Sequence, residues 1–134
     1  MSIGLLLITH PGIGAALLAT ASTTLRSCPL RTHCIEVGPD ADADALLDDA
    51  RRCIDEMDDG SGVLVLTDAY GATPSNIACH LLRQGRVNVV SGVNLPMLIR
   101  VLNYADQNLE SLTHKAAEGG MRGIQVSRGE MPSC

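Results

Sequence analysis

Residues 62–76 read Gly-Val-Leu-Val-Leu-Thr-Asp-Ala-Tyr-Gly-Ala-Thr-Pro-Ser-Asn, and this stretch decides the fold. The apolar, β-branched run at residues 63–67 predicts a strand buried on both faces, as in the interior of a parallel sheet. A polar loop follows the strand. Thr73-Pro74 then predicts the start of a helix through about residue 83, because threonine caps helices and proline suits the first helical position. The stretch is therefore one strand, loop and helix unit.

The same unit recurs before and after this stretch. Short apolar runs predict strands, and stretches with helical spacing of apolar residues predict helices between them. The expected strands are at residues 3–8, 33–37 and 87–90. The expected helices run from 12 to 25, from a cap at Asp40 to about 57, from Pro96 to about 103 and from 109 to 118. The last of these helices is expected to end at Gly119-Gly120. Residues 123–128 offer a fifth, partly polar strand that would lie at an edge. This alternation predicts an α/β doubly wound sandwich whose central sheet has four strands and is mainly parallel.

The amino-acid composition and the net charge exclude some classes of protein. The chain has 134 residues, 46% of them apolar, and its only aromatic side chains besides histidine are Tyr70 and Tyr104. One domain with an aliphatic core is expected at this length. The net charge of −5 and the shortage of stacking side chains exclude a typical nucleic-acid binder.

Cysteine usage and the N-terminus point to a cytoplasmic protein. Five cysteines, at positions 28, 34, 53, 79 and 134, form no Cys-x-x-Cys pair, so we expect buried free thiols rather than a disulfide framework or a zinc site. The sequence has no basic leader and no apolar stretch of the ~20 residues that a membrane span needs. We therefore expect no direct membrane insertion.

Polar residues follow three of the predicted strands, at positions 9–12, 68–73 and 91–94. If the strands are parallel and adjacent, these loops share one edge of the sheet, where ligands bind in such folds. The first two loops would then bring His10 and Asp68 together. A carboxylate bonded to one ring nitrogen sets the tautomer of a histidine and leaves the other nitrogen free to attack.

Histidine is the candidate nucleophile. The chain lacks the Gly-x-Ser-x-Gly elbow that carries a serine nucleophile. An imidazole nitrogen can accept a phosphoryl group as a labile phosphoramidate, and the Thr73 hydroxyl and the backbone amides after Pro74 would be donors for that group. Pro11 removes one N–H from the loop and biases His10 toward an extended backbone.

Simpler interpretations of the same residues stay open. A histidine at a strand end commonly serves only as a hydrogen-bonding group, Asp68 would suit a turn, and Thr73 would suit an N-cap. We expect Tyr70 to be a packed loop aromatic. Dinucleotide binding is disfavoured because Gly12-Ile13-Gly14 lacks the third glycine of the fingerprint, and a phosphoaspartate receiver would need acidic residues in the first loop.

Three motifs together resemble a known family. They are Ile8-Thr9-His10, the stretch Leu-Thr-Asp-Ala-Tyr-Gly-Ala-Thr-Pro-Ser-Asn at 66–76, and Ser-Gly-Val-Asn-Leu-Pro-Met-Leu at 91–98. The chain resembles the enzyme IIA domain of the mannose family of the bacterial phosphoenolpyruvate-dependent sugar phosphotransferase system (PTS). The likeness spans nearly the whole chain, so residues 1–134 are interpreted as a single PTS EIIA type-4 (mannose-like) domain.

The resemblance implies a phosphotransferase component with a phosphohistidine intermediate. The histidine-containing phosphocarrier protein (HPr) would donate a phosphoryl group to His10, which would pass it to a histidine of a IIB component during sugar uptake. Asp68 would orient His10, and Thr73, with Gly71 in the same loop, would help to bind the phosphate. No cofactor and no metal is expected. The family also implies a homodimer that exchanges the last strand, here residues 123–128, between subunits, which would cover an exposed edge.

This chain departs from the family's usual sequence at two places, and two alternative functions stay open. The family commonly has Gly-Gly-Ser-Pro where this chain has Gly71-Ala72-Thr73-Pro74, and Pro11 replaces a usual glycine. The 134 residues contain no IIB domain, so the acceptor would be a separate IIB protein or a regulatory target whose binding depends on phosphorylation. A small-molecule binder that uses the cleft at the strand ends is a further alternative. The transported sugar stays undetermined.

Overall fold

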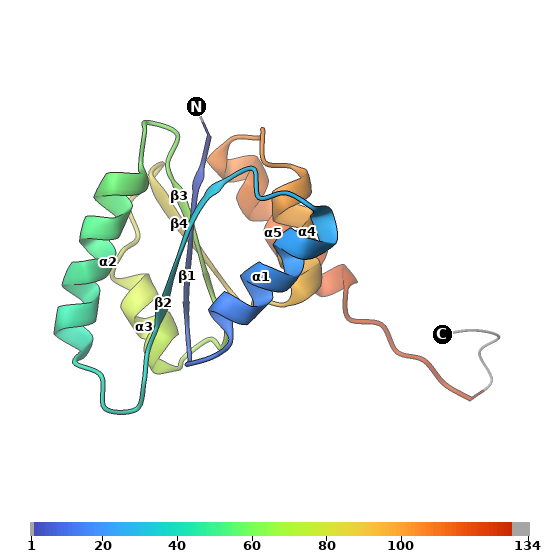
Figure 1. Ribbon diagram of the computed structural model, residues 1–134, viewed down its shortest axis with the longest axis horizontal. Helices are drawn as coiled ribbons and strands as arrows, with labels where there is room; N and C mark the ends of the chain where they lie inside the picture. Colours follow the sequence, from blue (N-terminus) through green and yellow to red (C-terminus); the bar gives the residue numbers. More distant parts are fainter. Residues whose placement is uncertain (1, 130–134) are drawn as a thin grey trace.

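A four-stranded parallel sheet forms the centre of the molecule (Figure 1). The structure is a computed structural model and describes residues 2–129. The strands are β1 (Gly4–Thr9), β2 (Arg31–Glu36), β3 (Val63–Thr67) and β4 (Val87–Ser91), in the spatial order β2-β1-β3-β4. All three neighbouring pairs are parallel. The predicted parallel α/β sheet of four strands is therefore confirmed.

Helices cover both faces of this sheet. Figure 1 shows α2 and α3 on one side, with α1, α4 and α5 on the other. Their bounds are α1 (Gly14–Leu25), α2 (Ala43–Met57), α3 (Thr73–Cys79), α4 (Leu95–Asn103) and α5 (Leu109–Arg122). Within the described residues, no helix is long and apolar enough to cross a membrane.

Strand β1 is buried on both faces because its side chains alternate between two aliphatic clusters. Leu5 and Leu7 pack with residues of α4 and α5, whereas Leu6 and Ile8 pack with residues of α2 and α3. Every residue of β1 and β3 is buried. Two-sided burial explains why these segments appear in the sequence as continuous apolar runs rather than as alternating ones.

The strand order places a topological switch point between β1 and β3. The chain leaves β1 for β2 on one side and later crosses to β3 on the other side of β1. The register pairs Ile8 of β1 with Thr67 of β3. His10 and Asp68, which follow these two strands, therefore emerge at the same sheet edge, where the crevice of such a fold lies.

Helices α2 and α3 begin or end at residues other than those predicted. Asp42, not Asp40, caps α2, and its carboxylate accepts hydrogen bonds from the amides of Asp44 and Ala45. Helix α3 ends at Cys79 instead of continuing to about Arg83. The backbone of Arg83 instead pairs antiparallel with Val87, because the chain must turn there to enter β4.

Helix α5 continues through Gly119-Gly120, which the sequence predicts as its end. Both glycines are buried against α4. A Cβ on Gly119 would lie 2.7 Å from the Cβ of Arg100, and a Cβ on Gly120 would lie 2.9 Å from the Cε of Met97. These glycines are therefore needed for the close approach of two helices rather than for a helix end.

The fifth strand predicted at residues 123–128 does not form within the part of the chain that the structure describes. Residues 124–128 belong to no strand or helix, are exposed and lead away from the body of the molecule (Figure 1). A strand needs a neighbouring strand to pair with, and within residues 2–129 the segment pairs with none.

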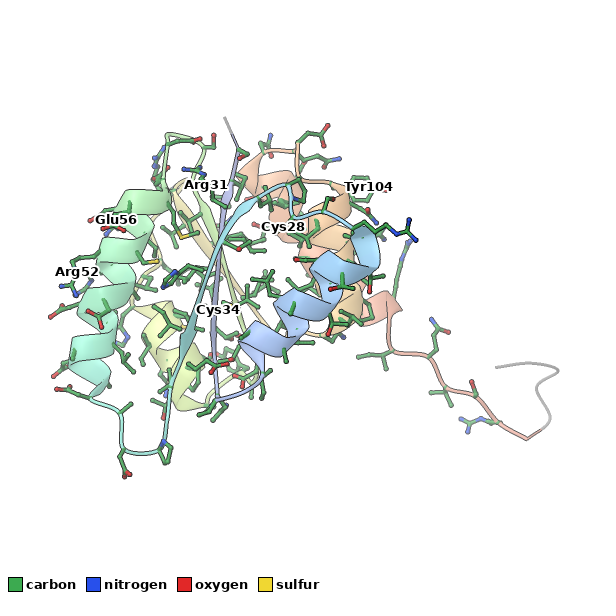
Figure 2. The ribbon with its side chains drawn as sticks, viewed as in Figure 1. Cys28, Arg31, Cys34, Arg52, Glu56 and Tyr104 are labelled. Atoms are coloured by element: carbon green, nitrogen blue, oxygen red, sulfur yellow. The ribbon has the colours of Figure 1, made fainter. Side chains whose placement is uncertain are left out.

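The exposure of the cysteines differs from the sequence-based expectation. Cys28 and Cys79 are exposed and Cys34 and Cys53 are half-buried, all as free thiols, so the expected burial of the cysteines is wrong for the first two. Figure 2 shows Cys34 on β2 and Cys28 in the loop before it. Cys134 lies outside the described residues. Burial, and then the charge of Glu36, raises the pKa of the Cys34 thiol above its usual value.

Candidate functional site

His10 and Asp68 meet at the carboxyl ends of β1 and β3. The ring Nδ1 of His10 lies 2.7 Å from Oδ2 of Asp68, and the backbone N–H of His10 donates to the same oxygen at 2.9 Å. The other carboxylate oxygen, Oδ1, accepts the N–H of Ala69 at 2.9 Å. The expected approach of the two residues is thus confirmed, and one carboxylate binds both the ring and the backbone of the histidine.

The Asp68 carboxylate is held in its charged form. Burial alone would raise its pKa, but hydrogen bonds from the His10 N–H, the His10 ring and the Ala69 N–H outweigh that effect and lower the pKa below its ordinary value of 3.8. A charged carboxylate can only accept hydrogen bonds. Nδ1 of His10 must therefore carry the ring proton.

This tautomer leaves Nε2 of His10 with a free lone pair. The His10 side chain is 47% exposed, whereas that of Asp68 is 10% exposed. Within residues 2–129 no hydrogen bond to Nε2 is found. The site thus presents an oriented imidazole with one nitrogen held by a carboxylate and the other available to a reacting group.

Two residues that the sequence analysis does not single out support the His10 loop. The buried hydroxyl of Thr9 donates to the His10 carbonyl at 2.8 Å and accepts the N–H of Gly14 at 2.9 Å. The Glu36 carboxylate accepts the N–H of Gly12 at 3.0 Å. For Thr9 the only sequence signal is a polar residue that ends an apolar run, and Glu36 carries no such signal.

A cleft of about 340 Å³ opens beside His10. The cleft is lined by His10, Pro11 and Thr73, and by residues 37–39 and 41 of the loop after β2. The structure therefore brings Thr73 to the cleft that contains the candidate nucleophile. Gly71 is not one of the lining residues; it forms a left-handed turn, with φ of +86°, between Asp68 and Thr73.

The loop between Asp68 and α3 corrects two expectations. Ala72, not Thr73, is the N-cap of α3, and no side chain caps this helix. The extended backbone of Ala72 places its carbonyl to accept the N–H of Asn76, so the Thr73 hydroxyl is not used for capping. Tyr70 is 85% exposed and is therefore not a packed loop aromatic.

The third predicted loop, at residues 91–94, has a structural role. Asn94 caps α4 by accepting the N–H of Met97 at 2.9 Å, and its amide donates to the carbonyl of Gly120 in α5 at 3.1 Å. Ser91 accepts a hydrogen bond from the Thr67 hydroxyl at 3.0 Å. The loop therefore joins α4, α5 and β3, and no hydrogen bond links it to His10 within the described residues.

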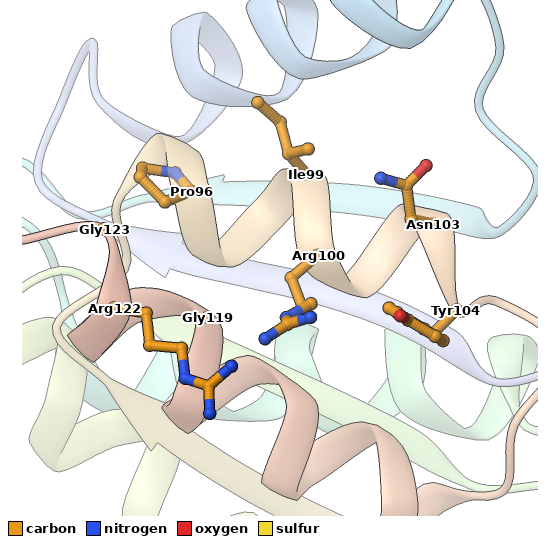
Figure 3. Close-up of a pocket in the computed structure, with 8 residues that line it drawn as sticks. All are labelled: Pro96, Ile99, Arg100, Asn103, Tyr104, Gly119, Arg122 and Gly123. Atoms are coloured by element: carbon orange, nitrogen blue, oxygen red, sulfur yellow. The ribbon is translucent and has the colours of Figure 1, made fainter.

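A larger groove, of about 690 Å³, lies between α4 and α5 (Figure 3). Arg100 and Arg122 line it, and both bind Glu118, at 2.9 and 3.5 Å. The two guanidinium groups thus share one carboxylate, and none of the four predicted site residues lines this groove. Within residues 2–129, no group of three or more potential metal-binding side chains is found.

Known proteins resemble this chain in sequence. The sequence model of the family EIIA-man, described as "PTS system fructose IIA component", matches residues 4–117. The chain is 28% identical over 133 residues to the "PTS system mannose-specific EIIAB component" of Escherichia coli strain K12, and to that of Shigella flexneri. These alignments cover 97% of this chain and 41% of those proteins. The chain thus spans less than half the length of these curated relatives.

Solved structures share the fold. The mannose/sorbose specific IIA subunit of the phosphotransferase system from Enterococcus faecalis superimposes with a TM-score of 0.84 at 20% identity, over 100% of this chain and 99% of that one. The PTS IIA protein associated with the fucose utilization operon of Streptococcus pneumoniae gives 0.73 at 27% identity, over 88% and 93%. The arrangement of strands and helices around His10 is therefore one that solved structures also have.

Proposed function

Because the chain belongs to the EIIA-man family of PTS IIA components, we propose that it is a phosphocarrier phosphorylated on His10. In this proposal residues 1–134 act as a single mannose-like IIA domain. HPr donates the phosphoryl group, and a IIB component receives it during sugar uptake. The observation that carries the proposal is the 2.7 Å contact between Nδ1 of His10 and Asp68, which leaves Nε2 as the nucleophile.

The proposed reaction is a transfer between two imidazoles. The lone pair on Nε2 of His10 attacks the phosphorus of a phosphohistidine on HPr. A new N–P bond forms, the donor's N–P bond breaks, and its electron pair returns to the donor ring. The proton on Nδ1 stays on His10, and the charge of Asp68 stabilises the imidazolium character that develops. The same step in reverse delivers the phosphoryl group to a histidine of IIB.

Thr73 and Gly71 are the proposed phosphate-binding residues. Thr73 lines the cleft beside His10, and its hydroxyl does not cap the helix. The hydroxyl is therefore available to donate to a phosphoryl oxygen. Gly71 is proposed to act through the shape of the loop, because its left-handed turn determines how the chain passes from Asp68 to Thr73.

We also propose a homodimer in which the segment 124–128 of one subunit pairs with the sheet of the other. Ile124 and Val126 are exposed apolar residues two positions apart, so both would point to the same side of a strand. An apolar hollow of about 270 Å³ beside the outer strand β4 is lined by Val90, Met97 and Ile124 of the same chain. Covering this edge and this hollow would explain why an apolar segment leaves the body of the chain.

Phosphorylation in a reconstituted system tests the proposal. Labelled phosphoenolpyruvate, enzyme I and HPr should give an adduct that is labile in acid and stable in base, and His10→Ala should abolish it. An adduct that persists in His10→Ala would exclude His10 as the acceptor. Onward transfer to a IIB protein supports sugar uptake, whereas a partner bound in only one phosphorylation state, without transfer, supports the regulatory alternative.

A further inference from the structure

We propose that Thr9 is a positioning residue for His10, an inference that rests on the proposed function. Thr9 is the last residue of β1 and is completely buried, so its side chain cannot reach a partner or a phosphoryl group. Its hydroxyl nevertheless makes two hydrogen bonds, to the carbonyl of His10 and from the N–H of Gly14. Thr9 would therefore act on the reaction only through His10.

The two hydrogen bonds of His10 to Asp68 require a particular backbone geometry. One oxygen of Asp68 accepts both the N–H and Nδ1 of His10, at 2.9 and 2.7 Å. This oxygen can serve both donors only when the ring folds back toward its own amide. The N–H side of His10 is held by Asp68, and the carbonyl side is held by Thr9 at 2.8 Å. Rotation about the backbone of His10 would thus break contacts at both ends.

Helix α1 provides the fixed support for Thr9. Gly14 is the first residue of α1, and its N–H donates to the Thr9 hydroxyl at 2.9 Å. A Cβ on Gly14 would lie 3.0 Å from that hydroxyl, so glycine allows the helix to approach this closely. The Thr9 hydroxyl therefore links His10 to a helix anchored in the core, and it keeps Nε2 in one direction before a donor docks.

An isosteric pair of variants separates the hydroxyl from the shape of the side chain. Thr9→Val removes the hydroxyl and keeps the volume, and we expect it to lower kcat for phosphoryl transfer about tenfold or more with KM for HPr nearly unchanged. Thr9→Ser keeps the hydroxyl and should stay within about twofold of the wild-type kcat. Thr67→Val, which removes an equally buried hydroxyl that bonds Ser91 instead, is the matched control and should also stay within about twofold.

Nitrogen-15 NMR of the unphosphorylated protein gives a readout that does not depend on transfer. In the wild type and in Thr9→Ser, His10 should show one tautomer with the proton on Nδ1. In Thr9→Val a mixture should appear, since the ring no longer has one fixed direction. Gly14→Ala, which crowds the same hydroxyl, should shift the tautomer in the same direction and serves as the test if Thr9→Val does not fold.

The outcomes are distinguishable. Loss of kcat and of the single tautomer in Thr9→Val, with rescue in Thr9→Ser, supports the positioning role. Wild-type values for Thr9→Val, or an equal loss in Thr9→Ser or Thr67→Val, overturns it. If the wild type accepts no phosphoryl group, the proposed function fails and the tautomer alone decides whether Thr9 positions the ring.

Discussion

Oδ2 of Asp68 accepts two hydrogen bonds from His10, one from the backbone N–H and one from the ring. The two residues are 58 positions apart in sequence. Their contact therefore depends on the parallel register of β1 and β3, which ends both strands at the same edge. A single oxygen thus sets the ring tautomer and the position of the ring relative to its own backbone.

Asp68→Asn should slow phosphoryl transfer by roughly 10²–10⁴-fold, because an amide supplies no charge to the developing imidazolium and can hold the wrong tautomer. The fold should be retained, as seen by circular dichroism. Initial rates with HPr as donor measure the effect. Asp55→Asn, on the exposed surface of α2, is the control and should transfer at the normal rate. A wild-type rate in Asp68→Asn would mean that the carboxylate does not orient His10.

The lowered pKa of Asp68 makes a prediction for stability at low pH. A carboxyl whose pKa is lower when folded stabilises the protein above its unfolded pKa, about 3.9, and this stabilisation is lost as pH falls through the folded pKa. As pH falls below the ordinary carboxyl pKa, the free energy of unfolding should therefore fall more steeply in the wild type than in Asp68→Asn. Urea titrations at several pH values measure both slopes. Parallel curves would contradict the hydrogen-bonded, charged state of Asp68.

Thr73→Ala should slow transfer about fivefold to tenfold through loss of one hydrogen bond to the phosphoryl group, and Thr73→Ser should restore most of the rate. Stability should not change, because Thr73 does not cap α3. Asn94→Ala should behave in the opposite manner: it removes the cap of α4 and should cost about 1 kcal/mol of unfolding free energy. Thermal unfolding and transfer rates of both variants test the contrast, and a destabilised Thr73→Ala would indicate a structural role instead.

Gly119→Ala should destabilise the protein by about 1–3 kcal/mol, although alanine favours helices. The new Cβ would lie 2.7 Å from the Cβ of Arg100, which cannot move without shifting α4. Gly38→Ala is the control, since a Cβ there meets nothing within 4 Å. Chemical denaturation measures both. A Gly119→Ala variant more stable than the wild type would disprove the close packing of α4 and α5.

Ile124→Asp should weaken the proposed dimer by at least tenfold in Kd, because it places a charge in the apolar hollow beside β4, which Ile124 itself helps to line and which the partner's segment would cover. Sedimentation equilibrium over a range of concentrations measures the change. Gln125→Asp, one position along on the opposite side of the segment, should have a smaller effect. A monomeric wild type, or equal effects of the two variants, would contradict the exchange of this segment between subunits.

Local sequence patterns were sufficient to predict the strands and most of the helices. The apolar runs at β1 and β3 predicted these strands, because a strand that is buried on both faces has apolar side chains at successive positions. The prediction failed where a distant contact decides the outcome. Gly119-Gly120 would end an isolated helix, yet here the two glycines allow α5 to pack against α4 and continue to Arg122. Residues 123–128 have strand-like composition but pair with no strand within residues 2–129.

The sequence by itself determined the alternation of strands and helices and the aliphatic core, and it identified His10 and Asp68 as candidates, because hydrophobic periodicity and strand-end motifs are properties of adjacent residues. Their contact required the parallel register of β1 and β3. Only the tertiary structure decided that Thr9 and Glu36 hold the His10 loop and that Thr73 faces the cleft without capping its helix. These contacts depend on strand order, register and the approach of helices, which bring together groups that the sequence keeps apart.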